Sequence, residues 1–187
     1  MIMLWSVIIG LLIGYLRGGK IENLAQIEFN YSWLIVAAIL IQIIILPLLP
    51  GMGPLIGSGQ SIFHIISYIL IGIFIVFNWR VFQVLIIGAG AFLNGIVISL
   101  NGGYMPASPN MLQRAGKGEI ARVLRETGQH SNVVKMGKDT ICNFLGDLLY
   151  LPHWLPFSSA FSIGDLIISI GIILLISDYM QPSKGKR

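Results

Sequence analysis

The sequence predicts an all-α membrane protein, a bundle of five transmembrane helices with one long loop. The chain is 55% hydrophobic and 11% charged, whereas soluble domains contain about 25% charged residues. No Asp, Glu, Lys or Arg occurs from Phe29 to Trp79, and a second charge-free run covers Val81 to Gln113. These observations exclude a soluble enzyme domain, a disordered tail and a disulfide scaffold. We expect residues 1–187 to form a single membrane domain.

Each predicted span is close to the length that a bilayer requires. A helix needs about 20 apolar residues to cross, with a range of about 17–25. The N-terminal segment lacks a basic region and a cleavage site, so we expect a retained span and not a signal peptide. The predicted spans are residues 1–17, 31–49, 61–78, 81–100 and 158–176.

Glycines in two of these spans predict close contacts between helices. The first span contains Gly10-x-x-x-Gly14, and the fourth contains Gly88, Gly90 and Gly95. Small residues let helix backbones approach closely in membranes. We interpret them as packing positions within one bundle, with a dimer interface as the alternative.

The positions of Lys and Arg predict the orientation. Arg17, Lys20 and Arg80 lie in two short loops on one side, together with the three basic residues of the C-terminal tail. The short loop 50–60 on the other side has none. Because Lys and Arg favour cytoplasmic loops, we expect the N-terminus and the long loop 101–157 outside and the C-terminus inside.

The net charge of +4 is also explained by a membrane location. It reflects cytoplasmic loops and contact with anionic lipids, so we expect membrane lipids as partners and no nucleic acid. Cys142 is the single cysteine, and no Cys/His spacing suits zinc, so we expect no metal and no cofactor.

The long loop is expected to contain short helices. Ser108-Pro109 resembles a helix start, and Ile120, Val123 and Leu124 share one helical face. We favour a solvated surface helix there over a helix lying on the lipid head groups. Residues 140–151 are apolar but too short to span, which predicts a re-entrant or interfacial helix.

The predicted topology gathers polar residues at the outer membrane boundary. Polar groups at membrane depth cost several kcal/mol when they lack partners, and they mark functional positions. We therefore predict a site with Asp147 and Asp165 as its acidic residues. The predicted ligand-binding residues are His64, Asn94, Asn101, Tyr104, Asn143 and Ser162.

Several of these residues have a structural interpretation as well. Ser162 and Asp165 stand at the spacing of a capping box, which would place them at a helix start. Asp147 is alternatively a cap, a partner of Lys138 or a solvent-facing side chain. His64 is alternatively a hydrogen-bonded residue at the membrane interface.

Three short motifs carry a resemblance to a known family. They are Asn101-Gly-Gly-Tyr104-Met-Pro106, then Leu145-Gly-Asp147, then Phe161-Ser162-Ile-Gly-Asp165. With these motifs the chain resembles a family of bacterial multi-pass membrane proteins of unknown function. The resemblance implies a helix bundle in a bacterial cytoplasmic membrane and implies no activity.

The last 40 or so residues are also similar to the end of lipoprotein signal peptidase. The resemblance implies that Asp147 and Asp165 form a catalytic pair, although Ser162 and Gly164 depart from that family's asparagine and alanine. Two carboxyls held close together share one proton. The ionised one would then activate water and the protonated one would polarise a carbonyl group.

Three functions therefore remain open. The first is an integral membrane protein with a ligand-binding or partner role at the outer polar site. The second is an aspartate-dependent intramembrane hydrolase that acts on a lipid-embedded substrate. The third is a component of a small transporter, for which Gln42 is the one clear polar residue in mid-span. Other membrane-protein subunits are possible partners.

Overall fold

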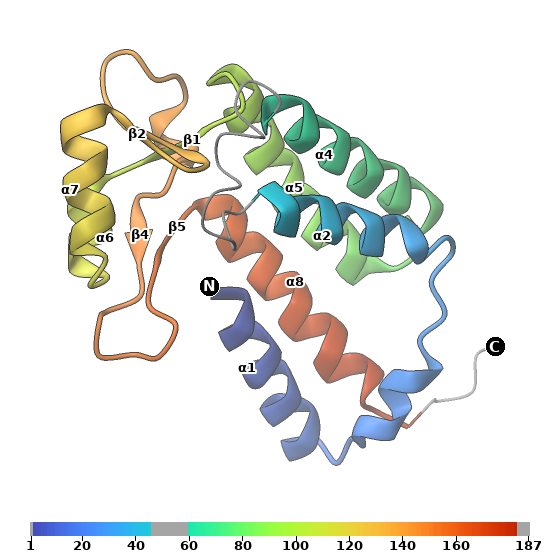
Figure 1. The fold of residues 1–187 in the computed structure, drawn as a ribbon. Helices are drawn as coiled ribbons and strands as arrows, with labels where there is room; N and C mark the ends of the chain where they lie inside the picture. The colour runs from blue at the N-terminus through green and yellow to red at the C-terminus, as the bar shows by residue number, and fades with distance from the viewer. Residues whose placement is uncertain (1, 46–59, 183–187) are drawn as a thin grey trace.

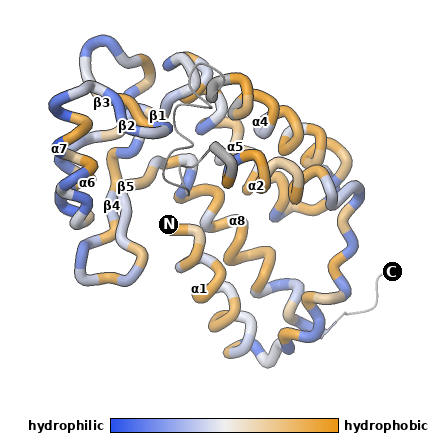
Figure 2. The backbone as a smooth tube through the Cα atoms, viewed as in Figure 1, coloured by the Kyte–Doolittle hydropathy of each residue, from blue (hydrophilic) through white to orange (hydrophobic). Residues whose placement is uncertain are grey.

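The computed structural model describes residues 2–45 and 60–182. Within these residues the chain is mostly helical, and five apolar helices pack in the neighbour order α1, α8, α5, α4, α2 (Figure 1). Figure 2 shows that hydrophobic residues run along these helices, whereas hydrophilic residues concentrate in the long loop. The five helices are α1 (Ile2–Leu16), α2 (Trp33–Ile45), α4 (Gln60–Phe77), α5 (Phe82–Leu100) and α8 (Ile163–Tyr179).

Glycines set the close contacts of α8 with its two neighbours. A Cβ atom on Gly90 of α5 would overlap the carbonyl oxygen of Gly164 and lie 2.8 Å from the amide nitrogen of Ile168. A Cβ atom on Gly10 of α1 would lie 3.3 Å from the backbone of Ile173. The glycines predicted to pack within one bundle therefore do so.

The same contacts give the helix directions. α8 runs antiparallel to α5 and parallel to α1. α4 runs antiparallel to α5, since Gly95 faces Tyr68 and Gly88 faces Ile75. It also runs antiparallel to α2, since Gln42 bonds to Ser67 and Leu34 clusters with Phe74. As a result α1, α4 and α8 begin at the end of the bundle where the long loop lies, and α2 and α5 finish there (Figure 1).

The observed helices match most predicted spans within two residues at the ends that the structure describes. The last helix differs because β5 (Ala160–Phe161) occupies the predicted start, so α8 begins only after Ser162. Residues 46–49 of the second predicted span lie outside the described residues.

Among the described helices, α5 alone is long and apolar enough to cross a membrane by itself. The apolar parts of α1, α2 and α4 are shorter. Helix length and composition therefore point to membrane association through α5 and do not by themselves give five crossings.

The long loop forms a small mixed α/β unit where only helices were predicted. Its elements are β1 (Met105–Ala107), α6 (Pro109–Arg114), α7 (Gly118–Thr127), β2 (Gln129–His130), β3 (Val133–Lys135), the 3₁₀ helix η3 (Asn143–Leu145) and β4 (Leu149–Tyr150). In the sheet β1-β3-β2, β1 pairs parallel with β3 and β2 pairs antiparallel with β3. The strand β4 pairs antiparallel with β5. A further 3₁₀ helix, η1 (Ile21–Gln26), follows α1.

The predicted amphipathic helix of the loop is α7. Its buried residues Ala121 and Leu124 pack with Ala107 of β1 and Leu112 of α6. The apolar face is therefore covered by the loop's own chain, in agreement with the interpretation as a solvated surface helix.

The prediction of a re-entrant or interfacial helix at residues 140–151 is wrong. The segment contains the single turn η3 and the strand β4. Cys142 has a left-handed backbone with φ of 55°, and the Asp147 amide donates to the carbonyl of Pro106. The backbone thus pairs with β1, far away in sequence, and its amides are not available for a local helix.

Candidate functional site

Asp165 lies at the start of α8 in a closed ring of hydrogen bonds. Ser162 caps the helix, accepting from the Asp165 amide at 3.0 Å, and the Ser162 amide donates to Asp165 Oδ2 at 3.2 Å. The side chain of Asn94 on α5 completes the ring: its Nδ2 donates to Asp165 Oδ1 at 2.8 Å, and its Oδ1 accepts from Ser162 Oγ at 2.8 Å. The capping box expected from the sequence is therefore present, and it also ties α8 to α5.

This ring is buried and needs a glycine beside it. Asn94 is 5% exposed and Ser162 is fully buried. A Cβ atom on Gly164 would collide with the amide oxygen of Asn94. Both carboxyl oxygens of Asp165 accept hydrogen bonds, so this side chain is fixed at the start of α8.

Asp147 reaches the same region from the long loop. Its amide donates to the Pro106 carbonyl at 2.8 Å, and its carbonyl accepts from the Ser108 amide at 3.1 Å, so its backbone is fixed beside β1. Its carboxyl group makes no hydrogen bond or ion pair with any side chain in the described part of the chain. Burial, and then the negative charge of Asp165, raise the pKa of Asp147 to about 7.

The two aspartates therefore differ in environment. Asp165 is fixed by Asn94 and Ser162. Asp147 is half-buried, has no side-chain partner among residues 2–45 and 60–182, and has a pKa raised to about 7. Such a pair can bind a group that donates hydrogen bonds, and it can divide acid and base roles between its two members.

Tyr68 of α4 is a third member that the sequence analysis missed. Its side chain packs on the buried cluster of Val97, Ile98 and Met105, and Leu145, two residues before Asp147, packs on the same cluster. One signal was available in the sequence: Tyr68 stands four residues after His64, and residues at this spacing share a helix face.

Two of the predicted ligand-binding residues, Asn101 and Asn143, use their side-chain amide groups in hydrogen bonds to nearby parts of the chain. Asn101 donates to the carbonyls of Val97 and Ile141 and accepts from the Ile141 amide, joining the end of α5 to the loop. Asn143 bonds to Thr140 and to the carbonyl of Gly137. These bonds hold the segment 137–143 of the loop together and attach it to the end of α5.

The other two predicted residues lie at the same end of the bundle. Tyr104 follows the turn after α5 and is half-buried. His64 belongs to the first two turns of α4, and its side chain lies outside the described residues. In the described residues no three His, Cys, Asp or Glu side chains gather as metal ligands.

A second polar cluster, also missed, joins helices at the opposite end. Asp178 of α8 accepts from Arg17 at 2.8 Å and from Gln83 of α5 at 2.9 Å. In mid-bundle, Gln42 donates to Ser67 Oγ at 3.4 Å. These contacts hold helices together, and none of them favours a transport path.

Comparison with known proteins agrees with the resemblance to a family of unknown function. A protein of Thermotoga maritima described as "Uncharacterized protein" is 27% identical over 169 residues, which cover 89% of this chain and 85% of that protein. No solved structure matches the chain. These comparisons give no support to the local similarity to lipoprotein signal peptidase, which stays a prediction. Residues 26–177 match the model of the family described as "Family of unknown function (DUF5317)", and the chain belongs to that family.

Proposed function

We propose that this chain is a five-span integral membrane protein that binds a hydrogen-bond-donating ligand between Asp147 and Asp165, at the outer membrane boundary. In this proposal the long loop and the N-terminus lie outside and the C-terminus lies in the cytoplasm. Support comes from the alternating helix directions, which bring Asn94, Ser162 and both aspartates to one end of the bundle.

The outer surface of the helices supports the membrane placement. Leu12, Leu40 and Ile69, from three different helices, are each more than half exposed. Soluble monomers rarely expose apolar patches of more than a few hundred Å². In a bilayer, lipid would cover these side chains. The helices α1, α2 and α4, whose apolar parts are shorter than α5, would be supported there by the helices packed beside them.

The unpartnered carboxyl group of Asp147 is the observation that carries the ligand proposal. This carboxyl group is half-buried and makes no hydrogen bond or ion pair with a side chain in the described residues, and a carboxyl group partly withdrawn from water is stabilised by a hydrogen-bond donor. Since Asp165 is already fixed by Asn94 and Ser162, a bound ligand is the group that would satisfy Asp147.

The inequality of the two aspartates favours a second candidate, an intramembrane aspartyl hydrolase. Asp165 would accept the proton of a water molecule as the water oxygen attacks a carbonyl carbon. Asp147, still protonated near neutral pH, would donate a hydrogen bond to the carbonyl oxygen. The proton on Asp165 would then pass to the leaving group as its bond to carbon breaks.

Aspartate substitutions test the proposed site. The full-length protein is purified in mild detergent and examined by native mass spectrometry for retained small molecules and lipids. We expect Asp147→Asn to lose a ligand that the wild type retains. The matched control Asp178→Asn makes the same chemical change at the other end of the bundle and should keep it. Equal retention by both variants would contradict the proposal.

The same variants separate the two candidates. If the protein is a hydrolase, Asp147→Asn and Asp165→Asn each abolish its function in the native host without lowering its membrane level. If it only binds a ligand, Asp165→Asn weakens the site by loosening the ring with Asn94, and the loss of function is partial.

A further inference from the structure

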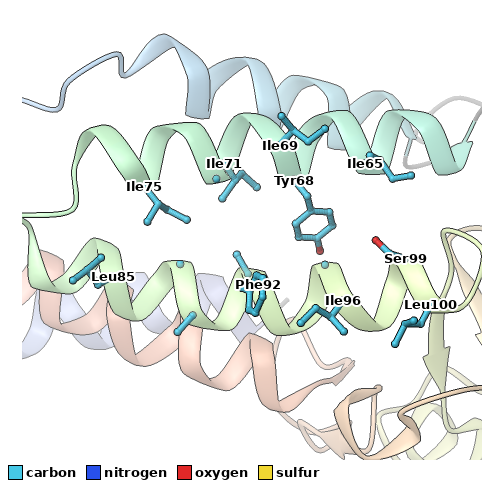
Figure 3. Close-up of a pocket in the computed structure, with 15 residues that line it drawn as sticks. Ile65, Tyr68, Ile69, Ile71, Ile75, Leu85, Phe92, Ile96, Ser99 and Leu100 are labelled. Atoms are coloured by element: carbon cyan, nitrogen blue, oxygen red, sulfur yellow. The ribbon is translucent and has the colours of Figure 1, made fainter.

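A groove of about 730 Å³ lies between α4 and α5 (Figure 3). All fifteen residues that line it belong to these two helices. No other described element contributes to its wall. In the proposed orientation it faces the lipid, because Ile65, Ile69 and Phe92 of its lining are exposed.

The groove is polar at one end only. Tyr68 and Ser99 supply the hydroxyl groups of its lining, and both lie in the half nearer the long loop. Ile75 and Leu85 line the opposite half (Figure 3). The lining on α5 extends from Leu85 to Leu100, about 22 Å of helix. This length suits one hydrocarbon chain with its polar end towards the loop.

Glycines explain how the space arises. A Cβ atom on Gly95 would lie 3.2 Å from the ring of Tyr68, and one on Gly88 would lie 2.8 Å from Ile75, so α4 and α5 approach closely at those levels. At Gly72, a Cβ atom would meet nothing within 4 Å. The missing side chain of Gly72 therefore leaves space within the groove wall.

The polar end of the groove adjoins the aspartate site. Tyr68 lines the groove and packs on the cluster that contains Met105, the residue before Pro106, whose carbonyl accepts from the Asp147 amide. Its ring also lies 3.2 Å from a Cβ atom placed on Gly95, the residue after Asn94. Neither aspartate forms an ion pair with a side chain in the described residues. Two neighbouring carboxyl groups favour a cationic group, and an ammonium group offers three hydrogen-bond donors.

We propose that the groove binds one acyl chain of an aminophospholipid, with the lipid's ammonium group at Asp147 and Asp165. This inference rests on the proposed ligand site and adds the class of its ligand. Tyr68 would lie where the chain meets the headgroup.

The test uses separate variants to fill the groove and to change Asp147. Full-length protein in detergent is mixed with phosphatidylethanolamine or with phosphatidylglycerol of the same acyl chains, and bound lipid is counted by native mass spectrometry. Gly72→Leu should reduce binding of both lipids at least about tenfold. Gly118→Leu, at another position where a Cβ atom meets nothing within 4 Å, is the control. Ala89→Phe is a second filling variant if Gly72→Leu fails to fold.

Asp147→Asn tests the headgroup. The variant should lose the preference for phosphatidylethanolamine over phosphatidylglycerol. It should still bind both lipids through their acyl chains. Unchanged binding in both filling variants would overturn the groove assignment and leave the proposed site standing. Loss of binding in Gly72→Leu, with the lipid preference kept in Asp147→Asn, would support the groove for the acyl chain and overturn the role of Asp147.

Discussion

The Nδ2 atom of Asn94 lies 2.8 Å from the Oδ1 atom of Asp165, and this hydrogen bond joins α5 to α8 across 71 residues of sequence. Asn94 also accepts from Ser162 Oγ, so one buried amide satisfies both polar side chains of the α8 cap. Its removal would leave a carboxylate oxygen and a hydroxyl group without these bonds.

We therefore expect Asn94→Leu to destabilise the protein. A buried group that loses its hydrogen-bond partner costs about 1–3 kcal/mol, and more when it is charged. Thermal unfolding of the purified protein in detergent measures the effect. Asn110→Leu is the control, since Asn110 is exposed and contacts Arg125 on the loop surface. An unchanged melting temperature for Asn94→Leu would show that the ring does not hold the two helices together.

The interface of α5 and α8 should tolerate no added side-chain atoms. Gly164→Ala would place a methyl group on the Asn94 amide, and Gly90→Ala would place one on the backbone of α8. Overpacking of this kind costs about 1–3 kcal/mol. Gly72→Ala is the matched control in another helix, because its methyl group enters open space and alanine favours helix by about 0.5–1 kcal/mol. Equal melting temperatures for all three variants would contradict the close packing.

The stability of the protein should depend on pH through Asp147. Burial and the charge of Asp165 raise its pKa from 3.8 to about 7, so between these values the folded state binds more protons than the unfolded state. This group's contribution to stability therefore falls as pH rises from about 4 to about 7. Because asparagine does not ionise, Asp147→Asn removes this fall in stability with rising pH.

The stability difference between Asp147→Asn and wild type should accordingly grow between about pH 4 and about pH 7, in favour of the variant. Melting temperatures in the same detergent over that range measure it. A difference that stays constant across the range would show that Asp147 titrates as it does in the unfolded chain.

The connection between β4 and β5 should touch the lipid surface. Trp154 is 71% exposed there, and Trp5 of α1 donates to the carbonyl of Pro156 at 2.9 Å, which ties the connection to the first helix. Tryptophan is typical of the membrane–water interface. With the other three tryptophans replaced by phenylalanine, Trp154 fluorescence should be quenched by lipids brominated near the headgroup.

A control position, Thr127, shows whether quenching is confined to the connection between β4 and β5. A tryptophan at Thr127, exposed at the end of α7, should be quenched far less in an otherwise tryptophan-free chain. Equal quenching at the two positions would place α7 on the membrane too, and the absence of quenching at Trp154 would remove this contact.

The sequence predicted the helices well because their signal is local. Long apolar runs located α1, α4 and α5, and the spacing of Ser162 and Asp165 identified the cap of α8. The strands of the loop were missed, since β1 pairs with a segment nearly 30 residues later and each strand has only two or three residues. Pairing over such distances leaves little trace in a single sequence.

The site was partly predictable for the same reason. Asn94 and both aspartates were expected at one end of the bundle because helix direction follows from counting the spans. The bond from Asn94 to Ser162, and the position of Tyr68, depend on how α4, α5 and α8 turn about their axes. The sequence does not specify that rotation, and the close contacts at Gly90 and Gly164 fix it in the structure.

Cysteine labelling in intact cells tests the central claim most directly. In a Cys142→Ser background, one cysteine is placed at Lys138 in the long loop and, in a second variant, at Glu22 in η1 at the opposite end of the bundle; both positions are exposed. A membrane-impermeant maleimide should label the cysteine at Lys138 in intact cells and the cysteine at Glu22 only after permeabilisation. Labelling of both in intact cells, or of Glu22 alone, would contradict the five-span bundle with its aspartate site outside.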